Sequence, residues 1–467
     1  MRQMIKFVKP FYPLIFCAVL LLFVQAMCDL NLPNYMSNIV NVGIQQYGVE
    51  DAAPDAISGE GLGLISLVMP EEVRADFTSN YEVFAGGSTR DVKIALGRLN
   101  SEYKGELYVL KSGADKAALN NTFSRAATAF FAYAQGLAKS SGVEVASSVE
   151  AGMSVDISQI LNMIGMFSVL PDGSWWEQAG EQAELVSAQT GVILTRMLYT
   201  QLGADMTAIQ RAYIIRTGLY MLGIALLSGG AAITVGFLAS RIGAGTARKL
   251  RNVFFRKVES FTNAEMDKFQ TASLITRCTN DILQIQIVFS MGIRFIFFSP
   301  IMAVGGVIMA LGKSTSMSWI IALACVVIIG LIATVLVIAM PKFQMMQKLI
   351  DKLNLVAREG LSGLMVIRAF NTEEHEQGRF DTANRDLAKT SLFVNRIMAF
   401  MMPVMMLVMN GVSILVMWVG AHQIASSSLQ VGDMMAFIQY LTQILMAFMM
   451  ISMMFFMFPG RVSKPLY

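Results

Sequence analysis

Six long apolar segments constrain this chain more than any other feature of its sequence. A helix that crosses a bilayer needs about 20 predominantly apolar residues. Segments of that kind lie at 11–30, 213–240, 294–311, 314–340, 397–420 and 434–458. Because backbone polar groups in hydrocarbon must be satisfied within the segment, each is expected to be helical. The predicted fold class is therefore an all-α membrane protein with six transmembrane helices.

The first segment admits a second interpretation, since the basic residues of 1–9 precede it as they would in a signal peptide. The transmembrane interpretation is favoured, because the apolar run is long and "DLNLP" at 29–33 contains no small-residue cleavage site.

Composition supports a membrane protein and argues against several kinds of site. Charged residues make up 15% of the chain, whereas about a quarter is usual in soluble domains. The four cysteines have no metal-type spacing, and there are only two histidines. We therefore expect no metal site, no catalytic residues and no disulfide scaffold. The net charge is only +3, and no nucleic-acid partner is expected.

Charge is distributed unevenly along the chain, which predicts its orientation. Residues 50–205 carry 10 Lys or Arg and 20 Asp or Glu, whereas the loops 241–285 and 341–396 carry eight and nine basic residues. Basic loops remain on the cytoplasmic side of a membrane. We therefore predict a multi-pass protein of a bacterial-type plasma (inner) membrane, with its N-terminus and both basic loops cytoplasmic and the acidic segment extracellular.

These patterns divide the chain into four parts. We predict the N-terminus and first transmembrane helix at 1–47, an extracellular insert at 48–208, five further transmembrane helices with two coupling loops at 209–460, and a truncated linker at 461–467. The loops are long enough for antiparallel helical arms, since twenty helical residues extend about 30 Å. The insert is expected to be small and mostly helical. Within it, 115–140 and the apolar stretch 156–171 favour helices, and "LYVLKSG" is either a strand or a helix end.

Two short motifs resemble parts of ATP-binding sites. "LGKST" at 311–315 ends like a phosphate-binding loop, but Val307 stands where the motif requires its first glycine. The stretch "LLSGGAA" at 226–232 lies inside an apolar segment, where small residues favour close helix packing. Neither motif predicts ATP binding by this chain.

The two cytoplasmic loops carry a family resemblance. The stretch "TARKLRNVFFRKVESFTNAEMDKFQTASLITRCTNDILQIQ" at 246–286 resembles the first intracellular loop of ABC exporters. The second loop is matched by "REGLSGLMVIRAFNTEEHEQGRFDTANRDLAKT" at 358–390. The stretches that begin "DLNLPNYM" at 29 and "GDMMAFIQ" at 432 fit the first and sixth helices of the same family. The resemblance covers roughly two thirds of the chain but not the insert.

The resemblance implies a coupling helix in each loop that docks on a nucleotide-binding domain. These helices map to 263–270 and 370–377, and both begin with residues suited to cap a helix, followed by acids. The expected coupling residues are Asn263, Glu265, Asp267, Phe269, Phe370, Asn371, Glu373 and Glu374.

The resemblance also implies the function. We expect the transmembrane subunit of an ATP-driven exporter of hydrophobic or amphipathic, multidrug-type substrates. The nucleotide-binding domain is expected on a separate ATPase subunit or lost by truncation, so that ATP and Mg bind there and no cofactor binds this chain. A second transmembrane subunit is expected, in a heterodimer rather than a homodimer. Two alternatives stay open, namely a sensory protein with an extracellular ligand site and an inactive regulatory partner of an intact transporter.

Polar, aromatic and methionine side chains in the apolar segments are the expected cavity contacts. Methionine is flexible and polarizable and suits varied apolar ligands. The residues are Met405, Met409, Trp418, Gln439, Tyr440 and Gln443. Asp29 is interpreted as a helix cap or kink, with a substrate contact as the alternative. Arg216 and Arg294 are expected to extend their charges toward the membrane surface.

Overall fold

The computed structural model describes residues 7, 9–84, 105–141, 174–181, 184–266 and 269–457. The chain divides into two compact units. The helical unit consists of Met1–Pro33, Ile224–Val419 and Phe437–Tyr467, and the insert unit consists of Asn34–Gly223 and Gly420–Ala436.

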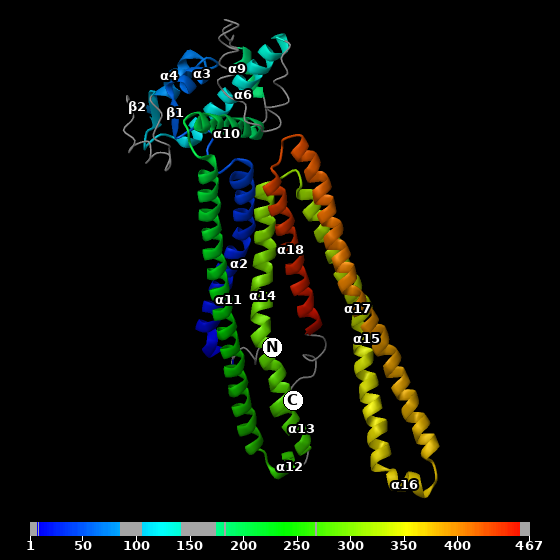
Figure 1. The fold of residues 1–467 in the computed structure, drawn as a ribbon. Helices are drawn as coiled ribbons and strands as arrows, with labels where there is room; N and C mark the ends of the chain where they lie inside the picture. The colour runs from blue at the N-terminus through cyan, green and yellow to red at the C-terminus, as the bar shows by residue number, and fades with distance from the viewer. Residues whose placement is uncertain are drawn as a thin grey trace. The chain divides into compact units, whose positions relative to one another are not determined.

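Within the part of the chain that the structure describes, six helices are long and apolar enough to cross a membrane, which confirms the six predicted segments. They are α2 (Tyr12–Asn38), α11 (Met206–Glu259), α14 (Ile282–Lys313), α15 (Ser318–Ser362), α17 (Glu373–Ala425) and α18 (Val431–Met457) (Figure 1). Large apolar side chains on them point outward, as in Leu226 and Ile233, which are 69% and 77% exposed. An apolar exterior of this kind is stable in lipid rather than in water.

Glycine allows close helix packing at a few positions in the helical unit. A Cβ atom on Gly243 of α11 would lie 2.9 Å from the backbone oxygen of Gln286 on α14, and one on Gly306 would lie 2.8 Å from Ile444 of α18. Of the small residues in "LLSGGAA", Ser228 and Ala231 are buried, whereas no atom lies within 4 Å of a Cβ built on Gly229 or Gly230. These two glycines lie on a face that no described part of the chain covers.

Two helical arms continue the spans, as the fold class predicted. In the first, α11 leads through α12 (Asn263–Met266), α13 (Thr271–Thr276) and the π-helix η3 (Arg277–Asp281) into α14. In the second, α15 and α17 are joined by α16 (Leu364–Ala369) (Figure 1). We call the turns around α12 and α16 the first and second elbows.

The "LGKST" motif lies in a tight hairpin between two helices. Lys313 ends α14, Ser314 has extended backbone angles, and α15 begins at Ser318. No strand precedes the motif, so it lacks the strand-to-helix setting of a phosphate loop. This part of the chain therefore does not form a nucleotide site.

The insert is mostly helical, as predicted, but it also contains a small sheet. The strands β1 (Ala56–Ser58), β3 (Leu107–Leu110) and β2 (Tyr81–Phe84) pair antiparallel in that order. The open question about "LYVLKSG" is thereby answered as a strand. The helices are α3 (Gly59–Ser66), α4 (Glu71–Ser79), α6 (Lys116–Ser141), α9 (Ser174–Glu181) and α10 (Glu184–Gln201). The predicted helix at 156–171 lies outside the described residues.

Aromatic side chains build the core of the insert, which contains no cysteine. The ring of Phe77 lies 5.2 Å from that of Tyr81 and 6.0 Å from that of Phe123. The hydroxyl of Tyr199 accepts a hydrogen bond of 2.9 Å from the amide of Asp55, and Tyr81 donates to the carbonyl of Pro54. Burial, with the nearby Asp55 charge, raises the pKa of both Tyr81 and Tyr199. Each buried phenol is therefore kept neutral and hydrogen-bonded.

A polar network holds the C-terminal end of α2 and the helix that follows it to the start of α18 within the insert unit. Here the π-helix η2 (Ile39–Gln45) continues α2. Asn41 accepts from the amide of Gly432 at 2.7 Å and donates to the hydroxyl of Ser37, which in turn donates to Asp433 at 2.7 Å. A separate carboxylate, Asp205, caps α11: it accepts from the Thr207 hydroxyl and from the amides of Thr207 and Ala208, and the hydroxyl bond first, then the amide bonds, lower its pKa.

Candidate functional sites

The first elbow is a capped turn braced by two stacked aromatic rings. The backbone amide and the hydroxyl of Thr262 both donate to the carboxylate of Glu265, at 2.9 and 3.1 Å. The rings of Phe261 and Phe269 stack with centroids 5.6 Å apart at 11°. Asn263 begins α12, and Asp267 lies outside the described residues. The predicted coupling residue Phe269 therefore supports the elbow from within.

Cations flank this aromatic pair. The ammonium of Lys257 lies 5.9 Å from the ring of Phe261, and the guanidinium of Arg277 lies 6.0 Å from that of Phe269. Such contacts contribute about 0.5–1 kcal/mol at exposed positions. Through the two rings they link the end of α11 to the start of η3. A movement of the first elbow would therefore be passed to both helices of the arm.

The second elbow presents its apolar side chains outward. Phe370 follows α16 and is 76% exposed, and Asn371 adopts a left-handed backbone with φ of 54°. The expected coupling helix at 370–377 begins too late: the short helix is α16, and Glu373 and Glu374 form the first turn of α17. Asparagine tolerates the left-handed region better than most residues, which explains why the chain turns there.

An ion-pair network closes the second arm beside its elbow. Arg379 of α17 pairs with Glu376 on the same helix at 2.9 Å and with Glu359 of α15 at 3.0 Å. Exposed pairs contribute little individually. A guanidinium shared by two carboxylates nevertheless sets the register of α15 against α17.

The six expected cavity residues lie on two helices and differ in exposure. Met405, Met409 and Trp418 belong to α17, whereas Gln439, Tyr440 and Gln443 belong to α18. Met405 and Tyr440 are buried, Met409 and Gln443 are half-buried, and Trp418 and Gln439 are exposed. Their role as cavity contacts stays a prediction.

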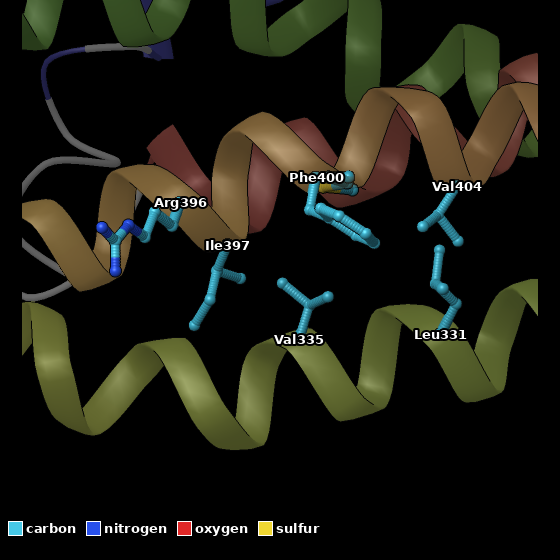
Figure 2. A pocket seen from close by; sticks show the side chains of 7 residues that line it. Leu331, Val335, Arg396, Ile397, Phe400 and Val404 are labelled. Carbon is cyan, nitrogen blue, oxygen red and sulfur yellow. The ribbon is translucent and has the colours of Figure 1, made fainter.

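A pocket of about 330 Å³ lies between α15 and α17. Figure 2 shows Leu331 and Val335 of α15 facing Ile397, Phe400 and Val404 of α17, with Arg396 at one end. Met401 also lines it, but none of the six expected cavity residues does. The walls are almost entirely apolar, so the pocket suits a hydrocarbon chain or a packed side chain.

Asp29 joins three helices of the helical unit. Its carboxylate accepts a hydrogen bond of 2.5 Å from the hydroxyl of Ser228 on α11, and its backbone oxygen accepts from the side-chain amide of Gln443 on α18 at 3.1 Å. The interpretation of Asp29 as a helix cap is wrong, because α2 continues to Asn38. Ser228 was not singled out from the sequence, because a serine in an apolar segment carries no local signal of a distant partner.

The two arginines near span ends have partners in their own units. The guanidinium of Arg216 lies 3.7 Å from the Glu50 carboxylate and over the ring of Tyr213. That of Arg294 lies 6.0 Å from the ring centroid of Phe298. Arg216 therefore has an acidic partner, whereas the contact of Arg294 is with an aromatic ring.

Comparison with known proteins identifies the membrane part of the chain. The model of the ABC transporter transmembrane region matches residues 183–448, which is more than half of the chain. An uncharacterized ABC transporter ATP-binding protein of Mycobacterium tuberculosis is 37% identical over 242 residues, which are 52% of this chain and 42% of that protein.

Two further relatives give the same result. An uncharacterized ABC transporter ATP-binding protein of Bacillus subtilis is 32% identical over 227 residues, 49% of this chain and 40% of its own. An ATP-dependent lipid A-core flippase of Pseudomonas fluorescens is 25% identical over 206 residues, 43% of this chain and 33% of its own. The chain thus spans less than half the length of these relatives. With the matched family region and the six membrane-spanning helices, the chain belongs to the ABC transporter transmembrane-region family.

Proposed function

We propose that this chain is the transmembrane part of an ATP-driven exporter that moves hydrophobic or amphipathic substrates out of the cytoplasm by alternating access. A nucleotide-binding domain hydrolyses ATP with Mg, and the two elbows transmit that energy. One observation carries the proposal, namely the cluster of exposed apolar side chains at the second elbow: Leu361, Met365, Val366 and Phe370 are 77%, 82%, 60% and 76% exposed.

Such a cluster at the end of a charged arm favours a protein partner over water. Exposed contiguous apolar surface marks an interaction site, and Glu373 and Glu374 place acidic charge beside it. The nucleotide-binding domain is the partner that the family supplies, and several relatives are named as ATP-binding proteins. The contacts would come from Phe370, Asn371, Glu373 and Glu374 in this elbow, and from Asn263, Glu265 and Phe269 in the first.

Orientation follows from the charges of the arms. The basic loops 241–285 and 341–396 lie on the cytoplasmic side, with the N-terminus, and the acidic insert lies outside. ATP is then available where the elbows are. Because a ligand shifts an equilibrium only by its differential affinity, ATP must favour the state in which the nucleotide-binding domains are closed.

A second transmembrane subunit completes the transporter, and we favour a heterodimer. Two differently tagged copies of the chain, expressed together, test this directly. Recovery of only one tag in each purification is expected of a heterodimer, whereas co-purification of both tags would contradict it.

The coupling proposal is tested by Phe370→Ala in vesicles that contain the chain and its ATP-binding partner. Loss of the exposed Phe370 ring is expected to lower the coupling ratio, which is the amount of substrate transported for each ATP hydrolysed, at least tenfold. Phe380→Ala is the matched control, because Phe380 is an exposed phenylalanine of the same arm beyond the elbow. Equal ratios in the wild-type protein and the Phe370 variant would overturn the proposal.

A further inference from the structure

We propose that Asp29, Gln443 and Gln25 form a recognition site for the protonated amine of an amphipathic substrate. This inference rests on the proposed export function for the direction of movement, and it deepens that function by naming a substrate class. All three residues belong to the helical unit, Gln25 and Asp29 on α2 and Gln443 on α18.

Asp29 is a carboxylate in a membrane-spanning helix, and the described residues provide no countercharge for it. None of the ion pairs formed by the described residues includes it; its carboxylate is held by the Ser228 hydroxyl alone. Ionisable residues within membrane spans are costly and usually serve a ligand, an ion path or a paired charge. A carboxylate held by a neutral donor lacks the positive charge that would balance it.

The side chains around Asp29 add hydrogen-bond acceptors that have no donor. The amide nitrogen of Gln443 is used by the backbone oxygen of Asp29, and its oxygen Oε1 is buried without a partner. Gln25 is 5% exposed, and its Oε1 is also buried without a partner. Gln25 and Asp29 are four residues apart on α2, so they lie on the same helix face. A cation that carries N–H donors would supply both the missing hydrogen bonds and the charge that balances the Asp29 carboxylate.

The composition of the site distinguishes an ammonium group from a metal ion. The described residues contain no group of three His, Cys, Asp or Glu that could hold a metal. One carboxylate with amide oxygens matches a single positive charge, whereas Ca²⁺ and Mg²⁺ take six or more oxygen ligands, and Zn²⁺ prefers cysteine and histidine. Leu30 and Ala26, next to Asp29 and Gln25 along α2, and Tyr440, about one turn before Gln443 on α18, are each at most 1% exposed. A cationic head on an apolar body fits both features.

The test measures equilibrium binding to the full chain in phosphatidylcholine nanodiscs. The probe is dansylcadaverine, a fluorescent primary amine, and its N-acetyl derivative is the uncharged counterpart. Asp29→Asn is expected to weaken binding of the amine at least tenfold and to leave binding of the acetylated probe unchanged. Absence of saturable amine binding to the wild-type chain, or equal affinity in the variant, would overturn the proposal.

A matched control and two further variants separate recognition from structure. Asp433→Asn alters a carboxylate that also accepts from a serine on another helix, at 2.7 Å from Ser37, and it should bind the amine like the wild-type chain. Ser228→Ala keeps the Asp29 charge, so amine affinity should be retained. An equal loss of amine affinity in Ser228→Ala and Asp29→Asn would show that the Asp29–Ser228 hydrogen bond only holds the helices together. It would refute recognition of the amine by Asp29.

If Asp29→Asn does not fold, Gln25→Met replaces the test. This variant removes one acceptor and is expected to weaken amine binding several-fold while binding of the acetylated probe stays the same; unchanged amine affinity would refute the site. Binding at equilibrium requires neither ATP nor transport. A failure of the export proposal would therefore leave these results intact, and a failure of the site would leave coupling intact.

Discussion

The core of the insert unit buries several phenylalanines, whereas the helices of the helical unit carry phenylalanines that are exposed. Phe77, Phe123 and Phe130 are at most 2% exposed in the insert, whereas Phe16 and Phe400 in the helices are 73% and 71% exposed. The insert folds like a water-soluble domain, in which burial of apolar surface drives folding. The spans have no such force between them, because lipid is as apolar as their side chains. Packing in the spans depends instead on close approach and on a few polar contacts.

The largest loss of stability is expected for a substitution in the core of the insert. Phe123→Ala removes a side chain that is 0% exposed and touches Phe77, and it should lower the free energy of unfolding by about 3–5 kcal/mol. Denaturant unfolding followed by the fluorescence of Trp175 and Trp176, which pack on this core, provides the measurement. A change below about 1 kcal/mol would contradict a tightly packed core.

In the helical unit, enlarging a residue should matter more than shortening one. Gly243→Val places side-chain atoms where the backbone oxygen of Gln286 already approaches, and overpacking of this kind costs about 1–3 kcal/mol. Thermal stability in detergent should fall. Gly229→Val is the control, since a Cβ there meets no atom within 4 Å. Equal melting temperatures for the two variants would contradict close packing of α11 on α14.

The buried phenols should make the insert sensitive to alkaline pH. An unfolded tyrosine has a pKa of about 10, and burial raises the pKa of Tyr199 and Tyr81 above that value in the folded state. Below about pH 10 the tyrosines keep their protons in both the folded and the unfolded state, so their contribution to the free energy of unfolding is fully present. Above it only the unfolded state ionises, so stability falls as pH rises.

Tyr199→Phe should reduce this alkaline slope. At neutral pH the same variant should cost about 1–3 kcal/mol, because the amide of Asp55 loses its acceptor. Unfolding measured between pH 8 and 11, a range chosen around the ordinary pKa of about 10, provides both values. An unchanged alkaline slope would show that Tyr199 is not the group responsible.

The smallest effect is expected for exposed side chains of the spans. Ile233→Ala shortens a residue of α11 that is 77% exposed, and its free energy of unfolding should change by no more than about 0.5 kcal/mol. Thermal unfolding in detergent, measured for Ile233→Ala and Phe123→Ala side by side, checks that the first variant loses much less stability than the second. A large loss for Ile233→Ala would show that a partner chain covers this face.

The spans, the arms and the family could be predicted because their signals are local and long. An apolar run of about 20 residues identifies a span from its neighbours alone. The resemblance implied the positions of the coupling helices and the capping residues supported them; Thr262 with Glu265 forms the expected capped start. The short helix expected at 370–377 differs from the structure, because Glu373 and Glu374 lie in the first turn of the long helix α17, and acids suit the first turn of a long helix as well as of a short one.

Tertiary structure alone decided the contacts between distant segments. The partners Asp29 and Ser228 are 199 residues apart, and Gln443 lies 414 residues from Asp29. The edge strand β1, which pairs through Ala56–Ser58, is only three residues long, too short for a periodic signal. By itself, the sequence determined which segments are helical and which environment each enters, since that depends on composition over one or two turns. The packing of those helices decides which glycine lies against a neighbouring backbone. It also decides which acceptors lie on the helices beside Asp29. No local sequence pattern encodes that packing.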